Sequence, residues 1–438
     1  MLSEIVVTSI RAQQKSANTA IPKDVGIYVH SLNPTFMVRS TFKNSSTHIN
    51  CLAVSSTHIF AAQADKAVLH VYSRDRGNQE ALISFPERIH SIALVNDGLL
   101  ALGTVEGRIL LWEVCTGRQV STPASHLQLV SCLASTKQIL ISGSDDSNIH
   151  IWSMPTLMSL TSIGPHEPLR SLSNHRAAIT ALAMGHSSDC TNICISASKD
   201  NTCVVWDYST GALLRTFLLP ATPLCLSLDP CDRAFYVGSE DGSIRTIDLF
   251  EPMSTINSLY DSKLQTTPIQ VISEPLSGAP SDIGSASCLG VSYDGTSLLS
   301  GHGSGKIIQW DVGPKKFSKE LVDVNAPINN MQILSPFPES LAAKAVMVVK
   351  PRLGESDYAY TGQLIKTLHG GKYDEVFHGP GFPSDMLAEA ITRFYAPAQT
   401  GSAGDAELRK ENEELWAIVK EQRALQKRTY EKYREANT

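Results

Sequence analysis

The sequence predicts an all-β fold, a seven-bladed β-propeller, that carries a C-terminal α-helical extension. Short apolar or alternating runs, separated by polar turns, fill most of residues 1–350 and have the length of β-strands. These runs recur with a period near 40 residues, which is about the length of one propeller blade. Residues 405–438 contain no Gly or Pro and place apolar residues at heptad spacing, which is typical of a long helix.

The clearest repeat spans residues 174–217 and reads as four antiparallel strands. Its third run, Cys203–Trp206, is apolar at consecutive positions, which indicates a strand that is buried on both faces. Trp206-Asp207 ends this strand, and Asn174-His175 precedes the first strand. This combination is the signature of a WD-repeat propeller blade.

Two repeats contain four polar residues that WD-repeat blades join by hydrogen bonds. The sets are His175, Ser196, Asp200 and Trp206, and His126, Ser142, Asp146 and Trp152. Because buried polar groups need partners, we expect each set to form a network that stabilises its blade. A Ser-His-Asp catalytic set uses the same residue types, but a constellation that is repeated favours the structural role. No catalytic, cofactor-binding or metal-binding residue is predicted.

The repeats align on the last residue of the third strand, and this register gives six blades. The aligned residues are Tyr72, Trp112, Trp152, Trp206, Ile247 and Trp310, at intervals of 40, 40, 54, 41 and 63 residues. The two long intervals indicate insertions at about 155–173 and 251–285. Runs at residues 4–10, 26–30 and 36–42 are expected to join residues 327–334, as the inner strand, in a seventh blade that closes the ring. A further strand is expected at 344–350, on the edge of that blade.

The polar set is incomplete in other blades. The Trp112 blade has Leu102 at the serine position, and the Trp310 blade keeps Ser300 but has Ser304 in place of the Asp. Residues 301–306, Gly-His-Gly-Ser-Gly-Lys, resemble a phosphate-binding loop. They lack the required spacing and lead into a strand, so we interpret them as a turn between strands.

Composition excludes several classes of protein. The chain has 438 residues, of which 42% are hydrophobic and 18% charged, and its formal net charge is −6. This charge gives no overall attraction to nucleic acid. Nine Cys without any Cys-x-x-Cys pair favour reduced core thiols over disulfides or zinc ligands. No apolar run reaches the length that a membrane span needs, so no membrane contact is expected.

The C-terminal part is expected to differ from the propeller. Residues 351–404 are interpreted as an irregular linker or arm with a short helix at 385–395, and residues 405–438 as one helix. Its apolar stripe consists of Leu408, Leu415, Trp416, Ile418 and Leu425. We interpret this stripe as a surface for a partner subunit or for self-association in a homodimer. Packing of the helix on its own propeller stays open as the alternative.

Taken together, the sequence resembles the WD-repeat subunit of the Rix–Ipi complex, which matures the large ribosomal subunit; its animal counterpart contains PELP and TEX proteins. The resemblance rests on the hairpin at 26–42, the blade at 238–250 that lacks a Trp, the long insertion after it and the heptad helix. It implies a non-catalytic scaffold in the nucleus that acts in removal of an internal transcribed spacer. The implied partners are protein subunits of a Rix–Ipi-type complex, the pre-ribosomal large subunit and the midasin AAA ATPase.

Other functions compete with this interpretation. One is a WD-repeat adaptor of a ubiquitin ligase or of a chromatin or replication-licensing complex. Another is a propeller enzyme, which would need catalytic side chains that converge on the central channel. Direct rRNA contact stays undecided, because the net charge is acidic and Lys315, Lys316 and Lys319 make only a small basic patch.

Overall fold

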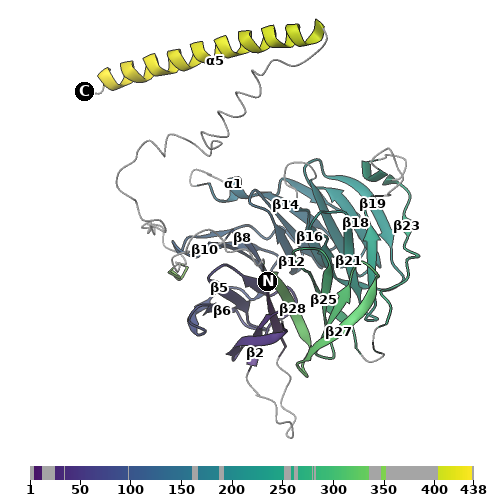
Figure 1. Ribbon diagram of the computed structural model, residues 1–438. Coiled ribbons are helices and arrows are strands. Elements are labelled where there is room, and N and C mark those ends of the chain that lie inside the picture. Colours follow the sequence, from purple (N-terminus) through teal and green to yellow (C-terminus); the bar gives the residue numbers. More distant parts are fainter. Residues whose placement is uncertain are drawn as a thin grey trace. The chain divides into compact units, whose positions relative to one another are not determined.

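The computed structural model describes residues 4–11, 25–33, 35–96, 98–159, 166–186, 192–250, 258–260, 265–278, 280, 283–334, 347–351 and 403–436. The chain divides into two compact units, residues 1–366 and 367–438. The first unit is a seven-bladed β-propeller, which confirms the predicted fold class (Figure 1). The second unit contains the long helix α5 (Ala403–Ala436).

Each blade is one sheet and is named here by the residue that ends its third strand. In chain order, the Tyr72 blade has β4 (Leu52–Val54), β5 (His58–Ala62), β6 (Val68–Ser73) and β7 (Gln79–Ser84); the Trp112 blade has β8 (Ile89–Asn96), β9 (Leu99–Thr104), β10 (Ile109–Glu113) and β11 (Gln119–Ser121); the Trp152 blade has β12 (Val130–Ser135), β13 (Ile139–Ser144), β14 (Ile149–Ser153) and β15 (Arg170–Leu172). The Trp206 blade has β16 (Ile179–Met184), β17 (Ile193–Ser198), β18 (Thr202–Asp207) and β19 (Ala212–Leu218); the Ile247 blade has β20 (Pro223–Leu228), β21 (Ala234–Ser239) and β22 (Ile244–Asp248); the Trp310 blade has β24 (Ala286–Val291), β25 (Ser297–His302), β26 (Lys306–Asp311) and β27 (Lys316–Asp323). A one-turn helix, α1 (Met154–Leu157), follows β14.

The seventh blade joins the two ends of the propeller sequence. Its strand order is β28 (Ile328–Leu334), β1 (Ile5–Ile10), β2 (Val25–Ser31) and β3 (Met37–Lys43), with β28 and β1 antiparallel. The Asn330 amide ties this blade to the Tyr72 blade, since its Nδ2 donates to the carbonyl oxygen of His48 at 2.7 Å and its Oδ1 accepts from the amide of Cys51 at 3.2 Å. The closure thus combines strand pairing with a buried side-chain amide.

The core lies between blades, and the third strands are buried on both faces. In β18, Cys203 and Val205 pack toward the Ile247 blade with Phe235 and Val237, whereas Val204 packs toward the Trp152 blade. All three β18 residues are fully buried. The consecutive apolar residues of the sequence therefore serve two different interfaces, as expected for a sheet that lies between two others.

The Ile247 blade departs from the expected pattern of four strands, because its sheet has three among the residues that the structure describes. After β22 the chain enters the long insertion, and part of it forms β23 (Ile269–Gln270), a parallel fifth strand beside β19 of the Trp206 blade. The same segment then contacts β22, where the amide of Leu276 donates to the carbonyl of Ile244 at 2.8 Å, and bridges to β27 at Ser277 and Lys316. One insertion therefore covers the outer edges of three blades, which protects these edges from pairing with other strands.

The prediction of a strand at residues 344–350 is wrong for its described part. Residues 347–350 have no strand and contact the Trp112 blade, where the amide of Val349 donates to the carbonyl of Val114 at 2.8 Å. The helix predicted at 385–395 lies outside the described residues. Among the described helices, none is long and apolar enough to span a membrane.

Candidate functional site

The four polar residues of the Trp152 blade come together at the end of the sheet. The loop before β12 supplies His126, β13 supplies Ser142, the β13–β14 turn supplies Asp146, and β14 supplies Trp152. Ser142 Oγ lies 3.0 Å from Trp152 Nε1 and 2.8 Å from His126 Nε2. The other ring nitrogen of His126, Nδ1, lies 3.3 Å from Asp146 Oδ2.

The Trp206 blade repeats this geometry with its own four residues. Ser196 Oγ lies 2.9 Å from Trp206 Nε1 and 2.7 Å from His175 Nε2. His175 Nδ1 lies 3.4 Å from Asp200 Oδ2 and 3.0 Å from the Thr202 hydroxyl. Both sets of four are therefore joined in the order Trp–Ser–His–Asp, and we call each of them a blade relay.

One direction of donation satisfies every group of a relay. The indole N–H donates to the serine oxygen, the serine hydroxyl donates to Nε2 of a neutral histidine, and Nδ1–H donates to the carboxylate. Burial lowers the pKa of His126 to about 4, and it also lowers the pKa of His175, so both rings are neutral at pH 7.

The carboxylate at the end of each relay also accepts hydrogen bonds from backbone amides. Asp146 accepts from the amides of Leu127 and Asn148, both at 2.9 Å, and Asp200 accepts from the amide of Arg176 at 2.9 Å. Burial alone would raise the pKa of Asp146, but these backbone hydrogen bonds and the neighbouring His126 lower it below its ordinary value. The ionised carboxylate thus fixes the turn between the second and third strands.

The relay geometry does not favour nucleophilic catalysis. Ser142 and Ser196 are fully buried, so a substrate has no access to their oxygens. Each serine oxygen also accepts an indole N–H, so one of its lone pairs is already engaged within the blade. The arrangement is better suited to hold four elements of one blade together.

A shorter relay, without an Asp, uses a histidine that the sequence interpretation missed. In the Trp310 blade, Trp310 Nε1 donates to Ser300 Oγ at 2.8 Å, and this oxygen lies 2.8 Å from Nε2 of His302. His302 is fully buried, and burial lowers its pKa to about 4. It stands two positions after Ser300 on β25, so strand alternation already placed both side chains on one face. The segment that resembles a phosphate loop is therefore the end of this strand and its turn.

The central channel is surrounded by a second, circular set of hydrogen bonds. Each inner strand or the residues next to it contribute a side chain that donates to a backbone carbonyl of the neighbouring blade. The pairs, in ring order, are Cys51 to His90, Ser91 to Val130, Ser131 to Ile179, Thr180 to Pro223, Cys225 to Ala286, Ser287 to Ile328 and Asn330 to His48. This ring links all seven blades at or next to their inner strands.

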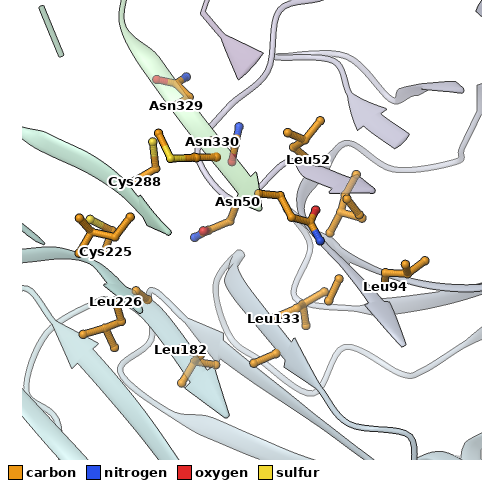
Figure 2. Close-up of a pocket in the computed structure, with 18 of the residues that line it drawn as sticks. Asn50, Leu52, Leu94, Leu133, Leu182, Cys225, Leu226, Cys288, Asn329 and Asn330 are labelled. Atoms are coloured by element: carbon orange, nitrogen blue, oxygen red, sulfur yellow. The ribbon is translucent and has the colours of Figure 1, made fainter. Parts of the chain in front are cut away.

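The channel itself forms a pocket of about 420 Å³ (Figure 2). Asn50 lies at this pocket, and its Nδ2 donates to the carbonyls of Ser131 and Thr180 at 3.1 and 3.3 Å, two and three blades away. The twenty residues that line it include no Asp, Glu, His, Lys or Arg. Its lining thus offers amides, hydroxyls, thiols and apolar groups, but no ordinary general acid or base.

Helix α5 presents the second candidate site, an apolar stripe. The exposed fractions are 57% for Leu415, 54% for Ile418 and 57% for Leu425, and Trp416 is exposed to 59%. The side chain of Leu408, the fifth residue of the predicted stripe, lies outside the described set. Exposed large apolar side chains that recur at heptad spacing are suited to bind a second helix.

Comparisons with known proteins agree with this fold. The family model "WD domain, G-beta repeat" matches residues 117–153 and 166–207, which include much of the Trp152 and Trp206 blades. The chain is 28% identical to pre-rRNA-processing protein crb3/ipi3 of Schizosaccharomyces pombe over 70% of this chain and 74% of the relative. It is 27% identical to pre-rRNA-processing protein IPI3 of Yarrowia lipolytica over 87% and 94%, respectively.

Animal proteins are similar as well. WD repeat-containing protein 18 of Danio rerio is 27% identical over 69% of this chain and 68% of the relative. The chain is therefore a WD-repeat β-propeller protein whose homologues include the pre-rRNA-processing proteins IPI3 and crb3/ipi3 and WD repeat-containing protein 18.

Proposed function

We propose that this protein is a non-catalytic scaffold subunit of a nuclear complex that processes pre-rRNA and assembles the large ribosomal subunit. The observation that carries the proposal is the similarity to a pre-rRNA-processing protein over 87% of this chain and 94% of the relative. Such coverage is longer than the propeller unit alone. The scaffold role accords with relays and a channel ring whose polar groups serve to hold blades together.

In this proposal, the two units of the chain have different tasks. The propeller offers its rim and faces to protein subunits of a Rix–Ipi-type complex, and the complex acts in internal spacer removal and docks the midasin AAA ATPase. The α5 stripe binds a partner subunit or a second copy of the chain. Leu415, Ile418 and Leu425 support this task, because their exposed apolar surface would be removed from water by a second helix.

Affinity purification of the tagged chain from nuclear extract, with proteins and RNA identified, tests the proposal. We expect precursors of the large subunit, midasin and the subunits of the processing complex. Ubiquitin-ligase or histone-modifying subunits without pre-rRNA would contradict it and would favour the adaptor function. Ultraviolet cross-linking before purification separates direct rRNA contact from contact through partner proteins.

A further inference from the structure

The Trp112 blade differs from the other three tryptophan blades in the partner of its indole. Trp152, Trp206 and Trp310 each donate Nε1–H to a serine on the second strand of the same blade. Leu102 replaces this serine in the Trp112 blade. Trp112 Nε1 donates instead to the carbonyl oxygen of Val349 at 3.2 Å, which lies 237 residues away in the sequence. Since Trp112 is fully buried, its N–H needs this partner.

Residues 347–351, which we call the strap, contact the blade through backbone and side chains. The amide of Val349 donates to the carbonyl of Val114 at 2.8 Å, directly after β10. Both backbone polar groups of Val349 are therefore bonded to the blade. Next to it, Val348 packs on the apolar cluster that the Tyr72 and Trp112 blades share. The strap is thus bound by one donor, one acceptor and one apolar contact within two residues.

Gly117 leaves the space that the strap occupies, because it has no side chain. Gly117 has φ +75, and a Cβ on it would lie 2.7 Å from the carbonyl oxygen of Lys350 and 2.8 Å from Cγ1 of Val349. Gly211 stands at the same turn of the Trp206 blade with φ +78. There the nearest atom to a Cβ is the flexible side-chain carbon Cδ of Arg170, at 3.2 Å. Both turns need glycine for their backbone, but only the turn at Gly117 has another backbone against it.

We propose that the Trp112 blade is an anchoring site for an extended segment of this chain, the strap, and that it fixes the point at which the C-terminal extension leaves the propeller. The blade has replaced its internal serine by a leucine, and the strap supplies the acceptor that the indole requires. The anchoring stands on the contacts of the strap alone. Its use in placing α5 for a partner rests on the proposed function.

Hydrogen exchange of the full chain, followed by mass spectrometry, tests the anchoring. We expect Gly117→Ala to speed exchange in the fragment that covers 347–350 at least tenfold, because the added methyl group displaces the strap backbone. Gly211→Ala is the matched control, since it places the same strain on the same turn and should leave that fragment unchanged. Equal exchange in the fragment for both variants would overturn the proposal.

A second pair of variants keeps the test decisive if Gly117→Ala does not fold. Trp112→Phe removes the N–H that binds Val349 together with part of the ring, and Trp152→Phe makes the same change at the N–H that binds Ser142. We expect faster exchange of the strap in the first variant alone. Unchanged exchange in Trp112→Phe, in a folded protein, would contradict the anchoring. If the full chain fails to capture the expected partners while its strap is still protected, only the proposed function is contradicted.

Discussion

The Trp206 blade and helix α5 both place large apolar residues at regular spacing, but they expose them very differently. Trp206 is 4% exposed and donates its N–H to Ser196, whereas Trp416 in α5 is 59% exposed. In the blade, the alternation of side chains along each strand and the 40-residue repeat place large apolar side chains where the propeller buries them. The heptad period leads to apolar side chains that are more than half exposed on α5. We therefore expect blade residues to determine stability and α5 residues to determine association.

The largest effect on stability is expected from a truncation in the relay blades. Trp206→Ala should lower the free energy of unfolding of the propeller by about 3–5 kcal/mol, because it leaves a large cavity and removes the donor to Ser196. Chemical denaturation measures this change. Trp416→Ala, the matched truncation in α5, should leave the propeller transition in place, and equal losses in both variants would remove the distinction between the two regions.

A smaller loss is expected when the centre of a relay is removed. Ser196→Ala leaves the Trp206 N–H and His175 Nε2 without their shared partner, which should cost about 1–3 kcal/mol. Ser171→Ala, at an exposed position of β15, serves as the control in the same denaturation series. A similar, small loss in both variants would mean that the relay contributes little to stability.

Acid should weaken the propeller in a defined range of pH. The folded pKa of His126 and of His302 is about 4, against 6.5 for an ordinary histidine, so the unfolded chain binds these protons first. Stability is therefore full above pH 6.5 and declines as the pH falls toward 4. Urea midpoints measured between pH 7 and pH 4 check this decline. We expect a shallower decline for His126→Gln, and a constant midpoint across this range would contradict the prediction.

Local patterns explain what the sequence could predict. The third strands, the turns and both four-residue sets follow from short-range spacing. Six blades follow from the repeat and the seventh from the need to close the ring, so the fold class was predictable. The acceptor for Trp112 was not, because a backbone carbonyl 237 residues away leaves no pattern in the sequence. The course of residues 269–277 over three blades depends likewise on contacts far along the chain. His302 was predictable in principle from its alternation with Ser300. The domain boundaries and the roles of the relays and of α5 stay predictions.

The smallest effect on propeller stability, together with the largest on assembly, is expected in α5. Leu415→Glu with Ile418→Glu puts two charges into the stripe, where burial against a second helix would remove them from water at high cost. The propeller transition should not shift, and co-purification of partners or of a second copy should be lost. Ala417→Glu with Ala424→Glu adds the same charge to exposed positions off the heptad seam, so it should keep both properties. Equal loss of assembly in both pairs would point to charge alone, and a parallel drop in the thermal transition of the first pair would mean that the stripe serves the fold of the propeller. Only selective loss in the first pair supports α5 as the association surface, because it separates position on the helix from net charge.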